Sequence, residues 1–359
     1  MKIAVLGQVA GPIAGQSRLN EAFCDGAEAE TRLFEFWGHK HWYGLPKMAA
    51  QFARAWWLAM TGGVDAAYIA VSRTNFGMMR DLFLLFPYVL AGIPIVGHIH
   101  GAEFDEFFLE NPKLRGPKQF YLKIMDRLVF VNEVFVPEGG ELAERSTFVR
   151  NPVPAFVTAA LAGEGDVDFA RPPGERRTFG FISTFARDKG VEHFLAAAKA
   201  LGDRADFVVA GGPSISDEEY GKDVLRQIEG MEEVEYLGYL SNPIGFYQRC
   251  DFMIFPTNYA SETSSLVVIE GLATRTHPIV RRHNRLVDIF GDAPISWFDD
   301  REELLAQCEA ALAMPQAELD AACDEAAPWV LANFPSQAQW VEQTEAIIRQ
   351  TVAEKRAEG

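Results

Sequence analysis

The 359-residue chain is poor in cysteine, in long apolar runs and in targeting signals. No two of its cysteines have a metal-site spacing, and they are too few for a disulfide scaffold, so we expect reduced, buried thiols in a cytosolic protein. No stretch reaches the ~18 uninterrupted apolar residues of a membrane span, and prolines break the most apolar region, residues 83–96. The apolar start, residues 1–7, is too short for a signal peptide and predicts a first strand. The four cysteines are Cys24, Cys250, Cys308 and Cys323.

Basic residues are also scarce relative to acidic ones, with 33 Lys and Arg against 50 Asp and Glu and a formal net charge of -17. Nucleic-acid binding requires a basic face, so this balance argues against such a partner. The charge is unevenly spread: residues 1–150 hold 15 basic and 16 acidic residues, whereas residues 151–359 hold 18 and 34. Length and asymmetry together indicate two domains.

Strand-like and helix-like segments alternate along the chain in two runs. The first run opens with a buried strand at 2–6, a glycine-containing loop at 7–15 and a helix from 16, but the loop does not match the dinucleotide pattern GxGxxG. The second run begins at 178, after a hinge at 151–154 and a polar stretch at 163–177. Such alternation predicts mostly parallel sheets covered by helices on both faces.

Residues 262–270 carry the clearest chemical motif, Glu-Thr-Ser-Ser-Leu-Val-Val-Ile-Glu. An apolar strand at 252–255 precedes it, and apolar residues recur at helical spacing after it. We therefore predict a helix that starts near Ser264 or Ser265 and contains Glu270. A helix N-terminus suits phosphate, and a carboxylate can accept hydrogen bonds from two ribose hydroxyls. A capped helix with two solvated glutamates is the other interpretation of the same pattern.

Residues 36–60 combine tryptophans with histidines, lysines and an arginine, and become helix-like from Pro46. Basic and aromatic residues on one amphipathic segment can dock on a membrane surface. The alternative is a buried helix that follows a polar loop. This segment allows peripheral contact with the inner membrane face by an otherwise cytoplasmic protein.

Taken together, several segments in order and spacing resemble a family 4 retaining glycosyltransferase of the GT-B fold. The resemblance runs nearly end to end and is strongest between Val234 and Pro278. The matching segments are Asn151-Pro152-Val153, Lys189-Gly190, 236–240, 250–257 and 262–273.

This resemblance implies an α/β chain with two Rossmann-like domains facing across a cleft and a final helix that crosses back to the first domain. Residues 1–151 plus about 335–359 would form the N-terminal, acceptor-side domain. Residues 152–334 would form the C-terminal domain that binds the nucleotide sugar.

The resemblance also implies roles for individual residues. Glu270 would hold the ribose hydroxyls, Glu262 would contact the donor sugar, and Lys189 with Arg187 would neutralise the diphosphate leaving group. His100, which ends a strand at Gly101, is the expected second catalytic residue beside Glu262, while His98 on the same strand face is expected to be structural. The remaining expected donor-binding residues are Gly15, Leu240, Ser264, Ser265 and Leu266.

The resemblance further implies a nucleoside diphosphate sugar as donor substrate, a saccharide or lipid-linked saccharide as acceptor, and no metal or other cofactor. Asp166-Val167-Asp168 has the form of a metal-binding DxD, but it lies in a polar linker and we assign it no metal. Two alternatives stay open: a degenerate transferase that serves as a binding or scaffold subunit, and a sugar-nucleotide epimerase of the same fold.

Three departures from the family pattern concern the donor site. The usual Glu-Gly-Phe-Gly is Glu262-Thr263-Ser264-Ser265, and the usual arginine five positions before the lysine is Thr184, which leaves Arg187 as the nearest substitute. The usual glycine-rich loop is replaced by Arg-Arg-His-Asn-Arg at 281–285. That segment could bind an anion or form a solvated turn, and we favour the turn because exposed charge is weak evidence for a site.

Overall fold

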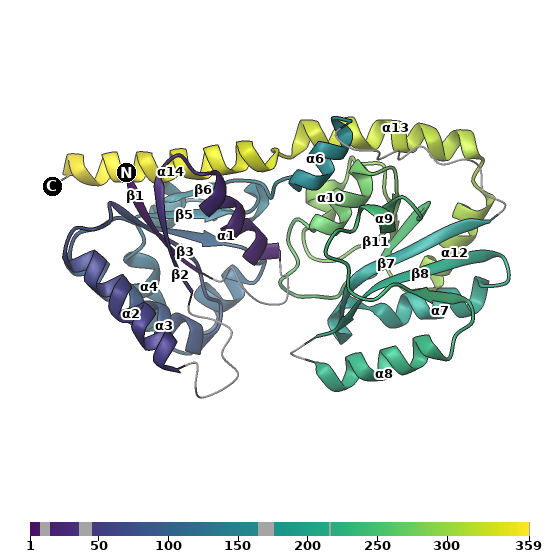
Figure 1. Ribbon diagram of the computed structural model, residues 1–359, viewed down its shortest axis with the longest axis horizontal. Coiled ribbons are helices and arrows are strands. Elements are labelled where there is room, and N and C mark those ends of the chain that lie inside the picture. The colour runs from purple at the N-terminus through teal and green to yellow at the C-terminus, as the bar shows by residue number, and fades with distance from the viewer. Residues whose placement is uncertain (8–14, 36–44, 164–175, 215–216, 359) are drawn as a thin grey trace. The chain divides into compact units, whose positions relative to one another are not determined.

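The computed structural model describes residues 1–7, 15–35, 45–163, 176–214 and 217–358. The chain forms two compact units (Figure 1). The first unit comprises Met1–Asn151 and Gln337–Gly359, and the second comprises Pro152–Ser336. Each unit is built on its own sheet and is described separately.

The first unit contains a six-stranded sheet in the order β2-β1-β3-β4-β5-β6, and all paired strands are parallel. The chain moves from β1 outward to β2, then returns to the other side of β1 and continues from β3 to β6. This reversal creates a switch point between β1 and β3. The strands are β1 Lys2–Leu6, β2 Glu30–Phe34, β3 Ala66–Ala70, β4 Ile95–Ile99, β5 Arg127–Phe130 and β6 Ser146–Phe148.

Helices cover both faces of the first sheet, because the parallel strands have apolar side chains on both faces that must be buried in a core. One core contains side chains of α2, α3, η2 and α4, and the other contains side chains of α1 and α14. The helices are α1 Gly15–Gly26, α2 Leu45–Met60, α3 Asn75–Leu90, η2 Asp105–Glu110, α4 Arg115–Lys123, η3 Glu133–Phe135, α5 Gly140–Glu144 and α14 Gln337–Glu358.

The second unit repeats this plan with a parallel sheet in the order β12-β11-β10-β7-β8-β9. From β7 the chain proceeds to β8 and β9 on one side and then to β10, β11 and β12 on the other. The switch point therefore lies between β7 and β10. The strands are β7 Arg177–Phe185, β8 Ala205–Pro213, β9 Val234–Tyr236, β10 Phe252–Phe255, β11 His277–Arg281 and β12 Ser296–Phe298.

The second sheet also has a core on each face. Side chains of α7, α8 and α12 fill one, and side chains of α6, α9, α10, α11 and α13 fill the other. The helices are α6 Ala155–Leu161, η4 Arg187–Lys189, α7 Val191–Leu201, α8 Glu218–Glu229, α9 Ile244–Tyr247, α10 Leu266–Ala273, α11 Leu286–Phe290, α12 Arg301–Ala313 and α13 Gln316–Asn333.

The predicted architecture of two parallel α/β units is confirmed, and so is the return of the last helix to the first unit. Trp340 of α14 is fully buried in the same core as strand residues of the first sheet. Three of the four cysteines are buried, Cys24 is half-buried, and all four are free thiols, as the sequence predicted.

Helix α3 begins at Asn75. Thr74 fixes this start, because its hydroxyl oxygen accepts a hydrogen bond from the backbone N–H of Gly77 at 3.1 Å and caps the helix.

Candidate functional site

The second unit gathers polar side chains at the carboxyl ends of β7 and β10. These two strands flank its switch point, where the following loops lead away in opposite directions. In open parallel sheets such a point leaves a crevice that binds ligands. Two helices, α7 and α10, begin just beyond it, and in neither does the cap residue, Gly190 or Ser265, form a side-chain cap within the described chain. Their first N–H groups are therefore suited to an anion.

Gly190 explains how the β7 loop approaches the end of β10. Its φ is 71°, a left-handed conformation that favours glycine, and a Cβ at this position would lie 2.3 Å from the carbonyl oxygen of Pro256. The same close approach lets the backbone N–H of Asn258 donate to the carbonyl oxygen of Asp188 at 2.7 Å. At Lys189 and Gly190, the loop that follows β7 thus packs directly against the loop that follows β10.

This junction brings Lys189 to Glu262. The Lys189 ammonium donates to Oε2 of Glu262 at 2.9 Å and lies 4.1 Å from the centroid of the Tyr259 ring, a cation–π contact. The Thr257 hydroxyl donates to the same carboxylate oxygen at 3.3 Å. Lys189 and Glu262 keep 21% and 12% of their side-chain surface exposed, so the pair is largely shielded but reachable. The carboxylate's Oε1 takes no part in these contacts.

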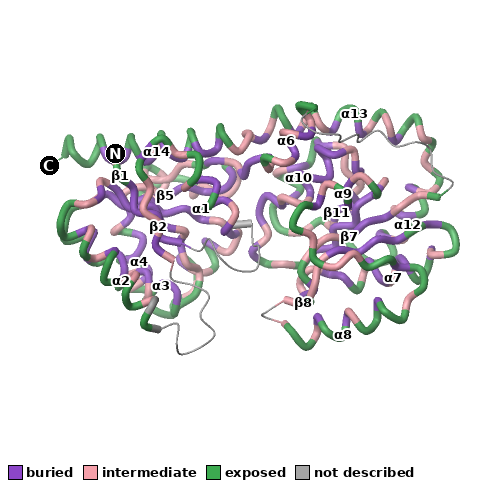
Figure 2. The backbone as a smooth tube through the Cα atoms, viewed as in Figure 1, coloured by how far each residue is buried: buried purple, intermediate pink, exposed green. Residues whose placement is uncertain are grey.

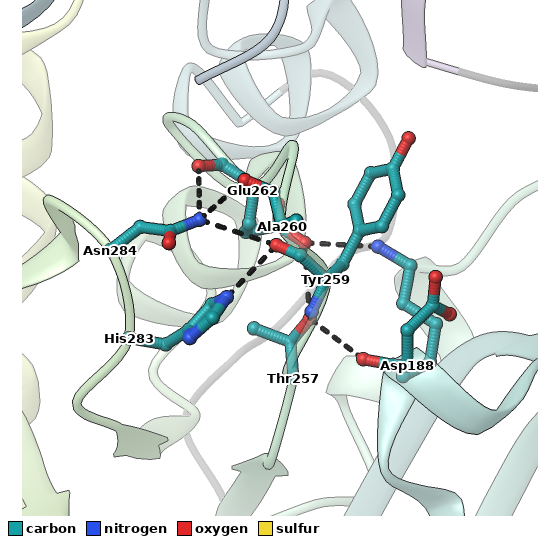
Figure 3. Close-up of polar contacts among 8 residues, drawn as sticks. Asp188, Thr257, Tyr259, Ala260, Glu262, His283 and Asn284 are labelled. Carbon is teal, nitrogen blue, oxygen red and sulfur yellow. Dashed lines mark hydrogen bonds and ion pairs between the residues drawn. The ribbon is translucent and has the colours of Figure 1, made fainter. Parts of the chain in front are cut away.

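Two residues that follow β11 hydrogen-bond to the loop that carries Glu262 (Figure 3). Nε2 of His283 lies 3.0 Å from the carbonyl oxygen of Tyr259, and the Asn284 amide donates to the carbonyl oxygen of Ala260 at 2.8 Å and more weakly to that of Glu262 at 3.4 Å. Asn284 adopts φ 48°, which asparagine tolerates.

The favoured solvated-turn interpretation of 281–285 is confirmed at 284–285, which form an exposed turn. Arg282 and Arg285 pair with nearby carboxylates on the surface. His283, which is half-buried, and Asn284 in addition hydrogen-bond to the loop that carries Glu262, and sequence reasoning did not predict those contacts.

The Thr-Ser-Ser stretch needs no glycine in this structure. Among the described non-glycine residues, positive φ occurs only at Leu114, Arg275 and Asn284, so Thr263, Ser264 and Ser265 adopt ordinary backbone conformations. All three are buried. α10 begins at Leu266 with Ser265 as its cap residue, which confirms the predicted helix start.

Glu270 lies inside α10 and is 5% exposed. The hydroxyl of Tyr247, on α9, donates to its Oε2 at 2.6 Å. A buried carboxylate needs hydrogen-bond donors, and the neutral Tyr247 supplies one without neutralising the charge. The interpretation of Glu270 as one of two solvated glutamates is wrong. Tyr247 was not among the predicted site residues.

Two other predicted donor residues have different surroundings. The Arg187 side chain is 73% exposed, with its guanidinium 4.6 Å from the Tyr220 ring centroid and 3.6 Å from Asp217. These partners lie on or beside α8, so the structure does not bring Arg187 together with Lys189 and Glu262. Leu240 follows β9 and packs, half-buried, against the core around α10.

In the first unit, His98 and His100 stack with ring centroids 4.1 Å apart. His98 is fully buried, and its Nδ1 lies 2.6 Å from the Tyr68 hydroxyl. Burial, and secondarily His100, holds the pKa of His98 well below its usual value. Burial, and secondarily the positive charge of Arg73, lowers the pKa of His100 to about 3. Both imidazoles are therefore neutral near pH 7.

Arg73 follows β3 at the switch point of the first sheet, and sequence reasoning did not select it. A Cβ on Gly101 would lie 1.3 Å from an Arg73 guanidinium nitrogen, so the end of this side chain packs directly against the glycine. The same nitrogen, Nη1, donates to Glu103 at 3.4 Å. Gly15 is the first residue of α1, and residues 8–14 of the predicted glycine loop lie outside the described residues.

Neither a metal cluster nor a membrane-spanning helix is found in the described part of the chain. No group of three or more His, Cys, Asp or Glu side chains there could hold a metal ion. Asp166 and Asp168 lie outside that part. The helices of the described ranges are each too short or too polar to cross a bilayer.

Comparison with known proteins gives a family match in the second unit and fold matches over the whole chain. Residues 166–328 match the family model described as Glycosyl transferases group 1. A search of curated proteins gives no match.

Solved structures with the same fold include HepE of Anabaena in complex with UDP and glucose. It is 14% identical, with 97% of this chain and 99% of that chain covered and a TM-score of 0.71. A glycosyltransferase from Rickettsia africae ESF-5 is 14% identical, with 98% and 99% covered and a TM-score of 0.68. An alpha,alpha-trehalose-phosphate synthase (UDP-forming) from Burkholderia xenovorans, in complex with glucose-6-phosphate, is 13% identical, with 97% and 100% covered and a TM-score of 0.66. The match to the group 1 glycosyl transferase model thus falls within the second unit, and the whole chain has the GT-B fold.

Proposed function

We propose that this protein transfers a sugar from a nucleoside diphosphate sugar to a saccharide or a lipid-linked saccharide, with retention of the anomeric configuration and without a metal ion. The observation that carries the proposal is the Lys189–Glu262 pair at the switch point of the second sheet, within the matched domain. The similar HepE structure was solved with UDP-glucose, which supports a nucleotide sugar as the donor.

In this proposal, different groups of the site bind the diphosphate, the ribose and the sugar of the donor. The diphosphate would lie against the Lys189 ammonium and the N-termini of α7 and α10, where a cation and two helix ends stabilise the charge of the leaving group. The ribose hydroxyls would donate to Glu270, which Tyr247 holds in place. Oε1 of Glu262 would accept a hydrogen bond from a hydroxyl of the donor sugar.

Lys189 is paired in the structure, and this pairing has a consequence for donor binding. An incoming diphosphate competes with Glu262 for the ammonium, so Lys189 must turn partly from the carboxylate toward the phosphate. The Tyr259 ring can hold the cation during that exchange, because its face attracts the ammonium whichever anion is present.

We assign acceptor binding and the role of His100 to the first unit. His100 is neutral near pH 7, so it would act by hydrogen bonding to the donor sugar near the reacting centre and not by carrying charge. A lipid-linked saccharide acceptor, used in bacterial polysaccharide or glycoconjugate assembly, would place the protein at the inner face of a membrane.

The experiment is a screen of nucleoside diphosphate sugars for thermal stabilisation, followed by turnover of the best donor with saccharide acceptors. Ligand binding to the native state raises Tm in proportion to affinity and concentration. We expect one donor class to stabilise the protein, and we expect nucleoside diphosphate release that requires an acceptor. The anomeric proton coupling of the product reports retention or inversion. Activity that persists in excess chelator supports the metal-free proposal.

Other outcomes point to the alternatives. Conversion of the donor to an epimer without any acceptor would identify an epimerase. Absence of stabilisation by every nucleoside diphosphate and its sugars would favour a binding or scaffold subunit.

A further inference from the structure

Helix α3 in the first unit exposes a continuous apolar row to solvent. Phe76 is 84% exposed and Leu90 63%, and the residues between them follow a spacing of three and four that places them on one side of the helix. From Phe76 to Leu90 every exposed residue of α3 is apolar. The row consists of Phe76, Met79, Phe83, Phe86, Val89 and Leu90.

Helix α2 extends this row. Its Trp57 and Met60 are 70% and 60% exposed. The two helices lie against each other, since the Trp56 and Phe83 ring centroids are 4.6 Å apart and the Tyr88 hydroxyl donates to the Ala55 carbonyl oxygen at 3.3 Å. Exposed segments recur along both helices (Figure 2). We call Trp57, Met60 and the α3 row together the α2–α3 apolar face.

Charge sets this face apart from the rest of the chain. The chain has 50 acidic residues, yet the only carboxylate within α2 and α3 is Asp81, which is fully buried and accepts hydrogen bonds from Arg80 and Tyr121. Among the described side chains of the two helices, the one exposed charge belongs to Arg54. Lys47 adds a second cation to α2 in the sequence. The described side chains of α2 and α3 thus expose a cation and no carboxylate, in a protein of net charge -17.

We propose that the α2–α3 apolar face docks on an anionic lipid bilayer. Phenylalanine, leucine, methionine and tryptophan insert into the boundary between headgroups and acyl chains, and Arg and Lys beside them attract anionic lipid. Protein–protein interfaces need about one hydrogen bond per 100–200 Å². The exposed residues from Phe76 to Leu90 offer no side-chain donor or acceptor, so lipid fits this face better than a protein partner.

The proposal does not depend on the donor site, and it extends the membrane contact from the segment the sequence indicated, residues 36–60, to α3. Residues 36–44 lie outside the described residues, and in α2 the side chains of Ala55 and Ala59 are buried. The larger part of the face belongs to α3.

The test is co-sedimentation of the full chain with vesicles of phosphatidylcholine alone and of an equimolar mixture of phosphatidylcholine and phosphatidylglycerol. The variant Phe76→Ser with Phe86→Ser removes two exposed rings from α3. Leu331→Ser with Val287→Ser is the matched control, because these side chains are 52% and 41% exposed and belong to the second unit. We expect the wild type and the control to bind the anionic vesicles, and the α3 variant to partition at least about tenfold less, from the apolar area lost. Binding should weaken, but persist, in high salt.

Three results would overturn the proposal. One is a wild type that does not sediment with the anionic vesicles. Another is an α3 variant that binds them as the wild type does. The third is a concentration-dependent dimer in light scattering that the α3 variant abolishes while no form binds vesicles, which would make the face a contact between two copies. Donor-induced thermal stabilisation should be the same in the α3 variant and the wild type, which verifies its fold and keeps this test separate from that of the donor site.

Discussion

The two units share one topology but carry different groups at their switch points. Between β7 and β10 of the second unit, an ammonium and a carboxylate form a shielded pair on a junction that requires glycine. In the first unit, Arg73 follows β3, and two neutral, stacked imidazoles lie on β4. The same fold thus carries a shielded ion pair at one switch point and an arginine beside two neutral imidazoles at the other.

The first prediction, with the largest effect, removes the charge of the second unit. Lys189→Ala or Glu262→Gln should lower kcat/KM for the donor by about 10²-fold or more, the effect of removing a charge-stabilising contact. The Thr257 hydroxyl donates to the same carboxylate at 3.3 Å and to the Asp188 carbonyl oxygen at 3.4 Å, and it accepts from the Tyr259 N–H at 3.2 Å. Thr257→Val removes these contacts but leaves the Lys189 charge in place, so its loss should stay below about tenfold. Steady-state kinetics with saturating acceptor measures all three. Near-normal turnover of Lys189→Ala would show that the second unit does not need this charge, and the contrast with the first unit would be lost.

The second prediction concerns Gly190, which joins the β7 and β10 loops. Gly190→Ala should lower the free energy of unfolding by about 1–3 kcal/mol, because the left-handed backbone and the contact with Pro256 both oppose a Cβ. Gly139→Ala in the first unit is the control, since Gly139 has φ 76° but no atom within 4 Å of the Cβ position. Urea unfolding measures both variants. An equal loss in the two would mean that the Pro256 contact contributes nothing.

The third prediction tests Glu270. Glu270→Gln keeps the shape of the side chain but removes its charge, and it should weaken nucleoside diphosphate binding by about tenfold, the value of one charge-assisted hydrogen bond. Tyr247→Phe removes only the hydroxyl that positions the carboxylate and should cost less. Calorimetric titration supplies both constants. A larger loss for Tyr247→Phe than for Glu270→Gln would reassign the site to the tyrosine.

The fourth prediction concerns a pH dependence of the first unit. The folded-state pKa of His100, about 3, lies below the unfolded value of about 6.5, so the unfolded chain binds the proton more readily. Its contribution to stability is complete above about pH 6.5 and declines as pH falls toward the folded pKa. His100→Asn should reduce the slope of unfolding free energy against pH between about 6.5 and 4 by at most about 1.4 kcal/mol per pH unit. An unchanged slope would show that His100 titrates normally.

His277 of the second unit provides the comparison for that experiment. Burial lowers its pKa to about 4, and its Nε2 lies 2.9 Å from the Ser296 hydroxyl. His277→Asn should therefore change the slope in the same direction.

Much of the fold was predictable because strand and helix periodicities were strong in the buried elements. The predicted strand at 2–6 and the predicted helix that contains Glu270 match the structure. Edge strand β2 was missed because its sequence, Glu-Thr-Arg-Leu-Phe, is largely polar, and α13 was missed because its apolar residues lack a clear helical face.

The donor-site candidates were predictable only in part. The Glu262 and Glu270 spacing located α10, but no pattern in the residues indicated that Tyr247, from another helix, would contact Glu270. The hydrogen bond from Asn284 to the Glu262 loop and the cation–π contact between Tyr259 and Lys189 form only because three strand ends converge in the folded chain. That convergence is a tertiary property. The position of Arg187 beside Tyr220 likewise depends on packing with α8.

The central claim is that Lys189, and not Arg187, receives the diphosphate of a nucleotide donor. The most direct measurement is calorimetric titration of the wild type, Lys189→Ala and Arg187→Ala with the nucleoside diphosphate that stabilises the protein best. The account predicts equal dissociation constants for the wild type and Arg187→Ala, and a constant at least about tenfold higher for Lys189→Ala. Equal binding by the wild type and Lys189→Ala would contradict it.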